Sequence, residues 1–214
     1  MATASAHKMT PAPATETSLP LIVGVGGTTR PGSSSEKVVR AVLAKAKALG
    51  ARTQMFGGAE LAALPHYAPE NPERATEQLA FIEAVRNADG LVIGTPGYHG
   101  GVSGLVKNTL DLLEDLRSDA RPYLDMRPVG CVVTAAGWQG GGITLSALRD
   151  IVHALRGWPT PLGITLNTVA ANPFGPDGAC VDPAVEGQVA AMAQQVVWLA
   201  RYAQASAHDQ AAAR

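Results

Sequence analysis

Apolar residues are arranged along the chain in two patterns, short continuous runs and longer segments with helical spacing. Five short segments predict buried strands, the second more weakly than the rest, because such runs are typical of parallel sheets: Leu19–Gly26, Ala51–Phe56, Gly90–Thr95, Pro128–Thr134 and Pro161–Thr168. Longer segments with apolar residues three and four positions apart predict amphipathic helices: Ser33–Leu49, Glu73–Asn87, Gly101–Leu116, Thr144–Leu155 and Pro183–Ala203. The stretch Gly57–Asn71 is expected to be a loop.

This order of elements predicts the fold class. A helix or a crossover loop follows each strand, which favours an α/β, doubly wound parallel sheet with helices on both faces. We expect one domain over residues 19–203, between flexible tails at residues 1–18 and 204–214. Ligands of such sheets bind outside the carboxyl ends of the strands. The segments after Gly26, Thr95 and Thr134 therefore become the places to look for function.

Composition narrows the function classes. The chain has 214 residues, with 17 basic and 18 acidic side chains, so it lacks the positive charge of a generic nucleic-acid binder. No segment has the roughly 20 apolar residues of a membrane helix, and the N-terminus lacks the apolar region of a signal peptide. Cys131 and Cys180 show neither metal-ligand spacing nor a disulfide framework. We expect a cytoplasmic protein with no metal, membrane or nucleic-acid partner.

Thirteen of the 23 glycines lie around the three strand ends, where we expect the backbone to approach a ligand. The first segment, Gly26–Lys37, also carries Arg30 and three serines, Ser33, Ser34 and Ser35, before a predicted helix. Hydroxyls, a planar cation and a helix N-terminus together suit a phosphate. The alternative is that the serines only cap the helix and Arg30 is solvated.

The motifs that this segment lacks limit the class of phosphate ligand that it could bind. A Walker A loop is absent, and the dinucleotide fingerprint is only half met, by Gly24 and Gly26 followed by Thr29. The second strand ends at Phe56–Gly57 without an acidic residue for a ribose hydroxyl. A mononucleotide is therefore favoured.

The second segment carries a specific resemblance. Pro96-Gly97-Tyr98-His99, followed by Ser103 to Asp111, resembles the P-x-Y-N…G-x-L-K-N-x-x-D motif of NADPH-dependent FMN reductases. The first segment resembles that family's S-x-R-x-G-S-x-N loop, with matching residues at Thr28, Arg30, Ser33 and Ser35. The resemblance runs from about Leu21 to Gly157. The chain departs from the family at two positions, Gly97 and His99, where Glu and Asn are common.

The resemblance implies a flavodoxin-like fold with five strands in the order 2-1-3-4-5. It implies bound FMN, NADPH or NADH as hydride donor, and a flavin, quinone, azo dye or metal oxyanion as acceptor. No catalytic side chain is expected, because the cofactor carries the chemistry. The implied cofactor-binding residues are Thr28, Arg30, Ser33, Ser34, Ser35, Pro96, Gly97, Tyr98, His99, Gly100, Thr134, Gly137 and Gly140.

Further expectations follow from the same resemblance. The backbone of Tyr98 and His99 can meet the polar edge of the flavin whatever their side chains are. Trp138 could stack on the ring, cover the edge of the site or pack against a partner subunit. Lys107, Asn108 and Asp111 are expected to support the helix or a subunit contact.

The family's usual assembly implies a homodimer or homotetramer. Helix Gly101–Leu116 and the charged loop Asp115–Arg127 are the candidate interface, with the alternative that this loop is solvated.

Two other functions stay open. One is an electron carrier, flavodoxin-like but without NAD(P)H activity of its own. Such carriers tend to be strongly acidic, whereas this chain has a formal charge of −1, so a reductase is favoured. The other is a scaffold whose flavin site has decayed, which the departures at Gly97 and His99 allow.

Overall fold

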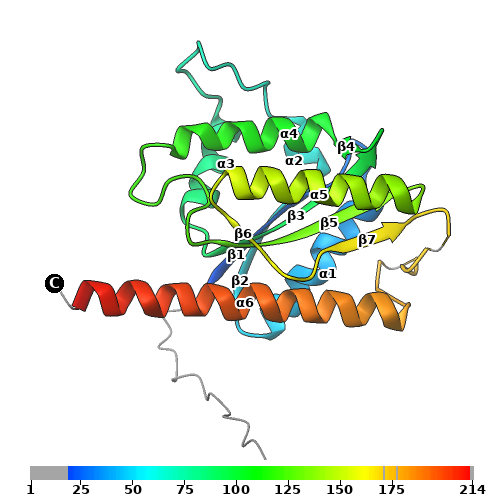
Figure 1. Cartoon of the computed structure of the whole chain (residues 1–214). Helices are drawn as coiled ribbons and strands as arrows, with labels where there is room; N and C mark the ends of the chain where they lie inside the picture. The colour runs from blue at the N-terminus through cyan, green and yellow to red at the C-terminus, as the bar shows by residue number, and fades with distance from the viewer. Residues whose placement is uncertain (1–18, 171, 177, 213–214) are drawn as a thin grey trace, which may run out of the picture.

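The computed structural model describes residues 19–170, 172–176 and 178–212 (Figure 1). The expected N-terminal tail, residues 1–18, lies outside the described residues. The strands are β1 (Leu21–Gly26), β2 (Arg52–Phe56), β3 (Gly90–Tyr98), β4 (Gly101–Val102), β5 (Pro128–Ala135), β6 (Trp158–Pro159) and β7 (Ile164–Asn167). The helices are α1 (Ser34–Ala48), α2 (Gly58–Ala62), α3 (Thr76–Arg86), α4 (Gly104–Asp111), the 3-10 helix η2 (Leu112–Leu116), α5 (Trp138–Ala154) and α6 (Pro183–Ala212).

The sheet has the flavodoxin-like arrangement. Its order is β2-β1-β3-β5-β6, with β7 also paired to β5, and all these pairs are parallel. Strand β7 lies within the predicted fifth strand, Pro161–Thr168, and the short strand β6 precedes it on the same side of β5. Pro159 and Pro161 lie at the break between them, and a proline cannot donate to a strand ladder. The predicted order is therefore confirmed, and the sheet differs from it by two added short strands, β4 and β6.

Alternating side chains along the strands build one core on each face of the sheet. Val23 and Val25 of β1 face a cluster formed with α3, α4 and α5, whereas Ile22 faces α1 and α6. On β5, Cys131 lies in the first cluster and Val132 in the second. Figure 1 shows the same division, with α1 and α6 on one side of the sheet and the other helices opposite.

Some of the glycines near the strand ends serve packing. A Cβ on Gly24 would lie 2.6 Å from Leu43 Cδ1, and one on Gly94 would lie 2.5 Å from Val39 Cγ2. Both glycines let α1 pack closely on β1 and β3. The expectation that these glycines approach a ligand is therefore wrong, because a helix of the same chain occupies that space.

Several helix boundaries differ from the prediction. Helix α5 begins at Trp138 instead of Thr144, so Gly140 and its two neighbouring glycines are helical and not in a loop. Glycine disfavours helix, but Gly141 lets α5 lie against β7, where a Cβ would be 2.4 Å from Thr165 Cγ2. The expected C-terminal tail from residue 204 continues α6 as helix to Ala212. None of the helices in the described ranges is long and apolar enough to cross a membrane.

The region before β3 also differs. Helix α2 lies in the stretch expected to be a loop, and α3 spans only Thr76–Arg86. On α3 the apolar Leu79 is 55% exposed, while the polar Gln78 is buried. The Gln78 amide accepts the N–H of Ala75 and donates to the carbonyl of Pro65, so hydrogen bonds replace apolar packing at this position.

Candidate functional site

The carboxyl ends of four strands meet at one edge of the sheet. Gly26 pairs with Gly94, Pro96 with Thr134, and Ala135 with Asn167, which places the segments after β1, β3, β5 and β7 side by side. The first three are the segments that the sequence singled out. The fourth was not predicted, although it also follows a strand end.

The segment between β1 and α1 holds the predicted phosphate loop. Thr28 Oγ1 accepts the N–H of Arg30 at 3.1 Å, which fixes a tight turn. Ser33 and Ser35 are buried, with their hydroxyls 3.4 Å apart, while Ser34 is half-buried. Ser33 precedes α1 without a side-chain capping hydrogen bond, so the serines do not serve as the cap that the alternative required. The first N–H groups of α1 therefore remain open to an anion.

Helix α2 supports this loop from behind. A Cβ on Gly58 would lie 1.9 Å from the carbonyl oxygen of Thr28, so the two backbones are in direct contact. The Glu36 carboxylate accepts the N–H of Gly58 at 3.3 Å and the Nε–H of Arg40 at 2.8 Å. The acidic residue in the first turn of α1 is thus paired with a cation and with a backbone N–H.

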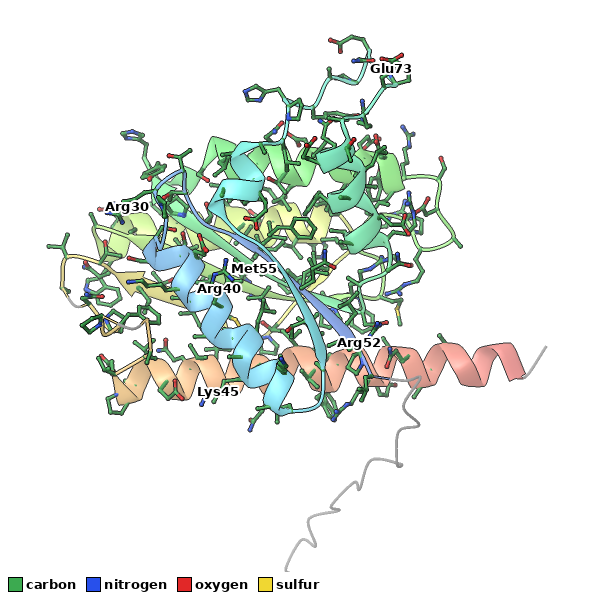
Figure 2. All side chains as sticks on the ribbon, turned by 180° about the vertical axis from the view of Figure 1, so that it is seen from behind. Arg30, Arg40, Lys45, Arg52, Met55 and Glu73 are labelled. Atoms are coloured by element: carbon green, nitrogen blue, oxygen red, sulfur yellow. The ribbon has the colours of Figure 1, made fainter. Side chains whose placement is uncertain are left out.

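A hollow of about 420 Å³ opens beside this loop. It is lined by Arg30, Pro31, Gly32, Ser34, Lys37, Thr168 and Asn172. Figure 2 shows Arg30 at the amino-terminal end of α1. Lys37, Thr168 and Asn172 were missed from the sequence. Lys37 lies one helical turn after Ser33, and the other two follow the last strand of the sheet, so their positions did carry a signal.

The predicted residues after β3 form a hairpin turn. Pro96, Gly97 and Tyr98 belong to β3, which pairs with β4. His99 and Gly100 follow with φ values of 54° and 77°, as in a type I′ turn. Tyr98 and His99 are exposed, so the backbone and side chains of this turn face outward.

The base of the hairpin is fixed by buried hydroxyls. Thr95 Oγ1 accepts the N–H of Ser103 at 3.0 Å and donates to the carbonyl of Pro96 at 2.9 Å. The Ser103 hydroxyl in turn caps α4 by accepting the N–H of Val106. Because both hydroxyls are buried, the hairpin is held in one position relative to α4.

Gly97 packs directly against Thr144 of α5. A Cβ at Gly97 would lie 2.9 Å from Thr144 Oγ1 and 3.2 Å from the Cβ of Ala135. Thr144 is fully buried, and its hydroxyl makes no hydrogen bond among the described residues. A side chain at position 97 would therefore crowd both Thr144 and Ala135.

The segment after β5 is short and leads directly into α5. Thr134 is buried on β5, Gly137 precedes α5, and Gly140 lies in its first turn. A Cβ on Gly137 or Gly140 would meet nothing within 4 Å, so neither glycine is required by packing within the chain. Trp138 is 64% exposed beside them. Space is available here for a flat ligand.

The remaining motif residues hold the structure together. Lys107 and Asp111 form an ion pair along α4. The Asn108 side chain accepts the N–H of Tyr67 at 2.8 Å and donates to the carbonyl of Pro65 at 3.1 Å. This supports the prediction that these residues have a structural role.

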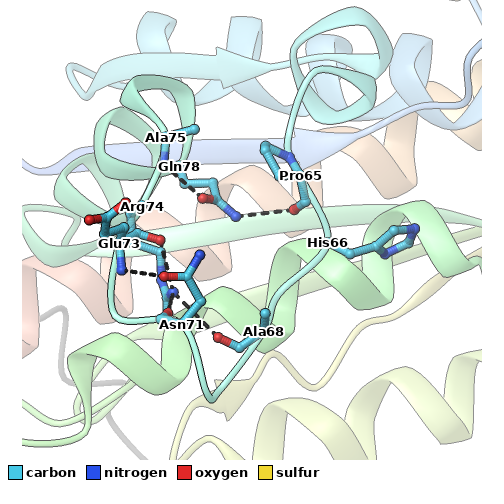
Figure 3. Close-up of a pocket in the computed structure, with 8 residues that line it drawn as sticks. All are labelled: Pro65, His66, Ala68, Asn71, Glu73, Arg74, Ala75 and Gln78. Carbon is cyan, nitrogen blue, oxygen red and sulfur yellow. Dashed lines mark hydrogen bonds between the residues drawn. The ribbon is translucent and has the colours of Figure 1, made fainter.

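A second hollow, of about 340 Å³, is lined by Pro65, His66, Ala68, Asn71, Glu73, Arg74, Ala75 and Gln78 (Figure 3). Its polar groups are largely paired within the chain. Arg74 binds the Asp115 carboxylate through two N–H groups, at 2.8 and 2.9 Å, and this hydrogen bonding raises the pKa of Arg74. His66 points away from the hollow in Figure 3. These contacts describe an anchored loop and not a binding site.

The charged loop before β5 forms its contacts within the chain. Arg117 pairs with Glu114, and Asp119 pairs with Arg86. Arg127 is 1% exposed and donates to the carbonyl oxygens of Arg86, Ala88 and Tyr123; burial lowers its pKa to about 10. Arg117, Asp119 and Arg127 therefore all have partners within the chain.

Cys131 is buried in the core, among the apolar residues of β5. Desolvation raises the pKa of its thiol to about 12, so it stays protonated at neutral pH. Cys180 is half-buried, and both cysteines are free. Cys131 lies inside β5, and Cys180 lies late in the segment between β7 and α6.

Comparison with known proteins identifies the family. A family model described as NADPH-dependent FMN reductase matches residues 20–170, which include the first three strand-end segments. The chain belongs to this family.

Curated relatives of this family member match over part of their length. An FMN-dependent NADPH-azoreductase of Staphylococcus haemolyticus (strain JCSC1435) is 40% identical over 99 residues, covering 45% of this chain and 47% of the relative. The corresponding enzyme of Staphylococcus aureus (strain USA300) is 41% identical over 85 residues, covering 38% and 40%. The alignments thus span less than half of these relatives.

Solved structures agree on the fold. FerB from Paracoccus denitrificans, an NAD(P)H:(acceptor) oxidoreductase, superposes with a TM-score of 0.66 at 18% identity, covering 83% of this chain and 97% of FerB. A WrbA-like flavodoxin from Agrobacterium tumefaciens gives 0.57 at 18% identity, covering 86% and 98%. At this identity the match establishes the flavodoxin-like fold alone.

Proposed function

We propose that this protein is an FMN-dependent NAD(P)H oxidoreductase that reduces a small-molecule acceptor such as an azo compound, a quinone or a free flavin. Family membership supports the reaction class, and relatives named as azoreductases support the choice of acceptor. The observation that carries the proposal is the meeting of the phosphate loop, the Tyr98–Gly100 turn and the open glycines of α5 at one edge.

The residues present fit a flavin mononucleotide. The open N–H groups of α1, with Ser33, Ser35 and Arg30 nearby, suit its phosphate. The exposed backbone of the 98–100 turn suits the polar edge of the ring, and the space at Gly137 and Gly140 suits its flat face. The bound flavin supplies the redox chemistry, and the protein binds and orients it.

Reconstitution tests this proposal directly. We expect the protein to remain yellow after incubation with FMN and desalting. Replacing Arg30 with alanine should weaken FMN binding by about 1.5–3 kcal/mol, the usual loss for a hydrogen bond to a charged group. Fluorescence titration measures this, with Arg121→Ala as control, because Arg121 lies in the loop before β5. A colourless wild-type protein would exclude a flavin function.

Turnover separates a reductase from an electron carrier. With FMN bound, we expect NADPH oxidation, followed by absorbance, to accelerate when an azo dye or a quinone is added. FMN binding without NADPH oxidation would favour the carrier instead. The near-neutral charge of the chain favours the reductase.

We also propose that the protein works as a homodimer or homotetramer in the cytoplasm. The free cysteines suit a reducing compartment. The exposed faces of α4 and the loop after it remain the candidate interface. Light scattering coupled to gel filtration measures the assembly, and a monomer at micromolar concentration would contradict it.

A further inference from the structure

The hairpin after β3 and the larger part of α5 carry no ionic side chain. They lie in residues 95–106 and 134–148. Charged residues make up 16% of the chain, yet neither segment contains an aspartate, a glutamate, a lysine or an arginine. The first charged residues after them are already bonded, Lys107 to Asp111 and Arg149 to the carbonyl oxygen of Thr160. The hairpin and α5 therefore offer a surface without charge of its own.

Large apolar side chains are exposed on this surface. Trp138 is 64% exposed and lies between Gly137 and Gly140 in the sequence, the two glycines beside which space is open. Ile143 is 52% exposed, and a Cβ on Gly100 would lie 3.5 Å from its Cγ2, so Ile143 stands beside the hairpin turn. Exposed apolar side chains that gather at the edge of a site are typical of a ligand-binding surface.

The positive charge of the candidate site lies on the other face of the sheet. Arg30 belongs to the loop that leads into α1, and α1 and α5 pack on opposite faces (Figure 1). An anion that enters beside α5 would give up part of its hydration, with no ionic side chain of the hairpin or of α5 to replace it. A flat, uncharged aromatic molecule avoids this cost and can pack on the indole of Trp138.

We propose that Trp138 and Ile143 determine which acceptor the enzyme reduces, by selecting uncharged aromatic acceptors over anionic ones. The inference rests on the proposed reductase function. It narrows the acceptors to uncharged azo compounds and quinones, with anionic acceptors such as free FMN reduced less efficiently. Trp138 supplies a flat surface for the aromatic ring, and Ile143 makes the approach beside the turn apolar. Neither residue is among the predicted cofactor-binding residues.

Two azo dyes that differ in one group test this selection. Dimethyl yellow is uncharged, and methyl orange is the same compound with one added sulfonate. Cleavage of either dye to two amines consumes two NADPH and two protons, so loss of colour gives kcat/KM for both with the FMN-loaded enzyme. The assay is run at about pH 8, above the usual titration range of histidine, because His99 lies in the turn.

The variants add or remove one feature at a time. Ile143→Lys and Ile143→Glu place opposite charges at one exposed position. Leu79→Lys and Leu79→Glu are the matched controls, because Leu79 is 55% exposed but lies on α3. Trp138→Ala removes the flat surface, and Trp138→Phe keeps an aromatic ring.

We expect the wild type to cleave dimethyl yellow with a kcat/KM about tenfold or more above that for methyl orange. Ile143→Lys should shift the ratio toward methyl orange by about threefold or more, and Ile143→Glu should shift it the other way. Trp138→Ala should lower kcat/KM for dimethyl yellow by about fivefold or more, and Trp138→Phe should restore most of the loss. The Leu79 variants should leave the ratio within about twofold of wild type.

Several results would overturn the selection. A wild type that prefers methyl orange would do so, as would a ratio that does not respond to the sign of the charge at position 143. A Trp138→Ala variant with unchanged kinetics but a changed oligomeric state, measured by light scattering, would assign Trp138 to a subunit contact instead.

Binding without turnover separates this inference from the proposed function. Equilibrium dialysis of the protein against each dye, with FMN present and NADPH absent, gives the two dissociation constants. If dimethyl yellow binds more tightly and the preference follows the charge at position 143, but no NADPH is oxidised, the selection stands and the reductase activity fails. If NADPH is oxidised while wild type and variants treat both dyes alike, the reductase stands and the selection is wrong.

Discussion

The contact between Gly97 and Thr144 shows how single residues shape the candidate site. Thr144 is buried, its hydroxyl has no hydrogen-bond partner in the described part of the chain, and glycine at position 97 leaves room for it. Any side chain at position 97 would have to displace the hydroxyl, the backbone of β3 or the Cβ of Ala135. The shape of the site beneath the 98–100 turn therefore depends on this pair.

We expect Gly97→Ala to lower the free energy of unfolding by about 1–3 kcal/mol, the usual cost of overpacking. In the Thr144→Ala background the same change should cost clearly less, because the hydroxyl at 2.9 Å is gone. Urea unfolding of the two single variants and the double variant measures the coupling. Additive effects would mean that Ala135 or the backbone, and not Thr144, limits position 97.

Sequence reasoning found the residues whose chemistry is visible in a motif and missed those recruited by packing. Arg30 and the serines were expected beside a phosphate because their types and order suggest it. Thr168 and Asn172 line the same hollow only because β7 ends next to β5. The unpaired hydroxyl of Thr144 likewise depends on how α5 packs on β3, which no local pattern specifies.

At the scale of the elements, α5 departs most from the prediction. Its first turns are glycine-rich, and local propensity alone favours a loop there. Only Gly141 is required by packing, against Thr165 of β7. A Cβ on Gly140 or Gly142 would meet nothing within 4 Å, so packing within the chain requires neither glycine. For Gly140, contact with the predicted cofactor would account for the glycine.

This pair gives a matched test of the cofactor surface. Both Gly140→Ala and Gly142→Ala should raise stability, each by about 0.5–1 kcal/mol, because alanine is the better helix former. Only Gly140→Ala should weaken FMN binding, since Gly140 lies among the predicted cofactor-binding residues. Thermal unfolding and FMN titration measure the two effects. Equal FMN affinity in both variants would remove Gly140 from the site.

For the whole molecule, the alternation of strands and helices predicted a parallel sheet, and the order of its strands was predictable only from the resemblance to NADPH-dependent FMN reductases. The length of α6 was not predictable in the same way. Its apolar stripe fades after Leu199 in the sequence, yet the helix continues to Ala212, and its last turns extend past the sheet in Figure 1. Trp198 and Tyr202 stack on its exposed side, with ring centroids 6.2 Å apart.

The candidate site lies at the carboxyl ends of the parallel strands, whereas Arg127 lies at the opposite edge of the sheet. The Arg127 guanidinium joins the end of α3, the turn between α3 and β3, and the loop before β5 by donating to the carbonyl oxygens of Arg86, Ala88 and Tyr123. It does so at the amino ends of the parallel strands, because Arg127 precedes β5. The two edges are therefore expected to make separate contributions, one to binding and one to stability.

Replacing Arg127 with methionine tests this separation. Methionine retains an unbranched apolar side chain but lacks the guanidinium, which leaves buried carbonyl groups without a donor. We therefore expect a loss of about 3 kcal/mol in the free energy of unfolding. FMN affinity, measured at a temperature where the variant is fully folded, should stay within about twofold of wild type. Arg121→Met, at an unpaired neighbour in the same loop, should change neither quantity. Weaker FMN binding by folded Arg127→Met would show instead that the two edges are coupled through the sheet, since β3 and β5 run between them.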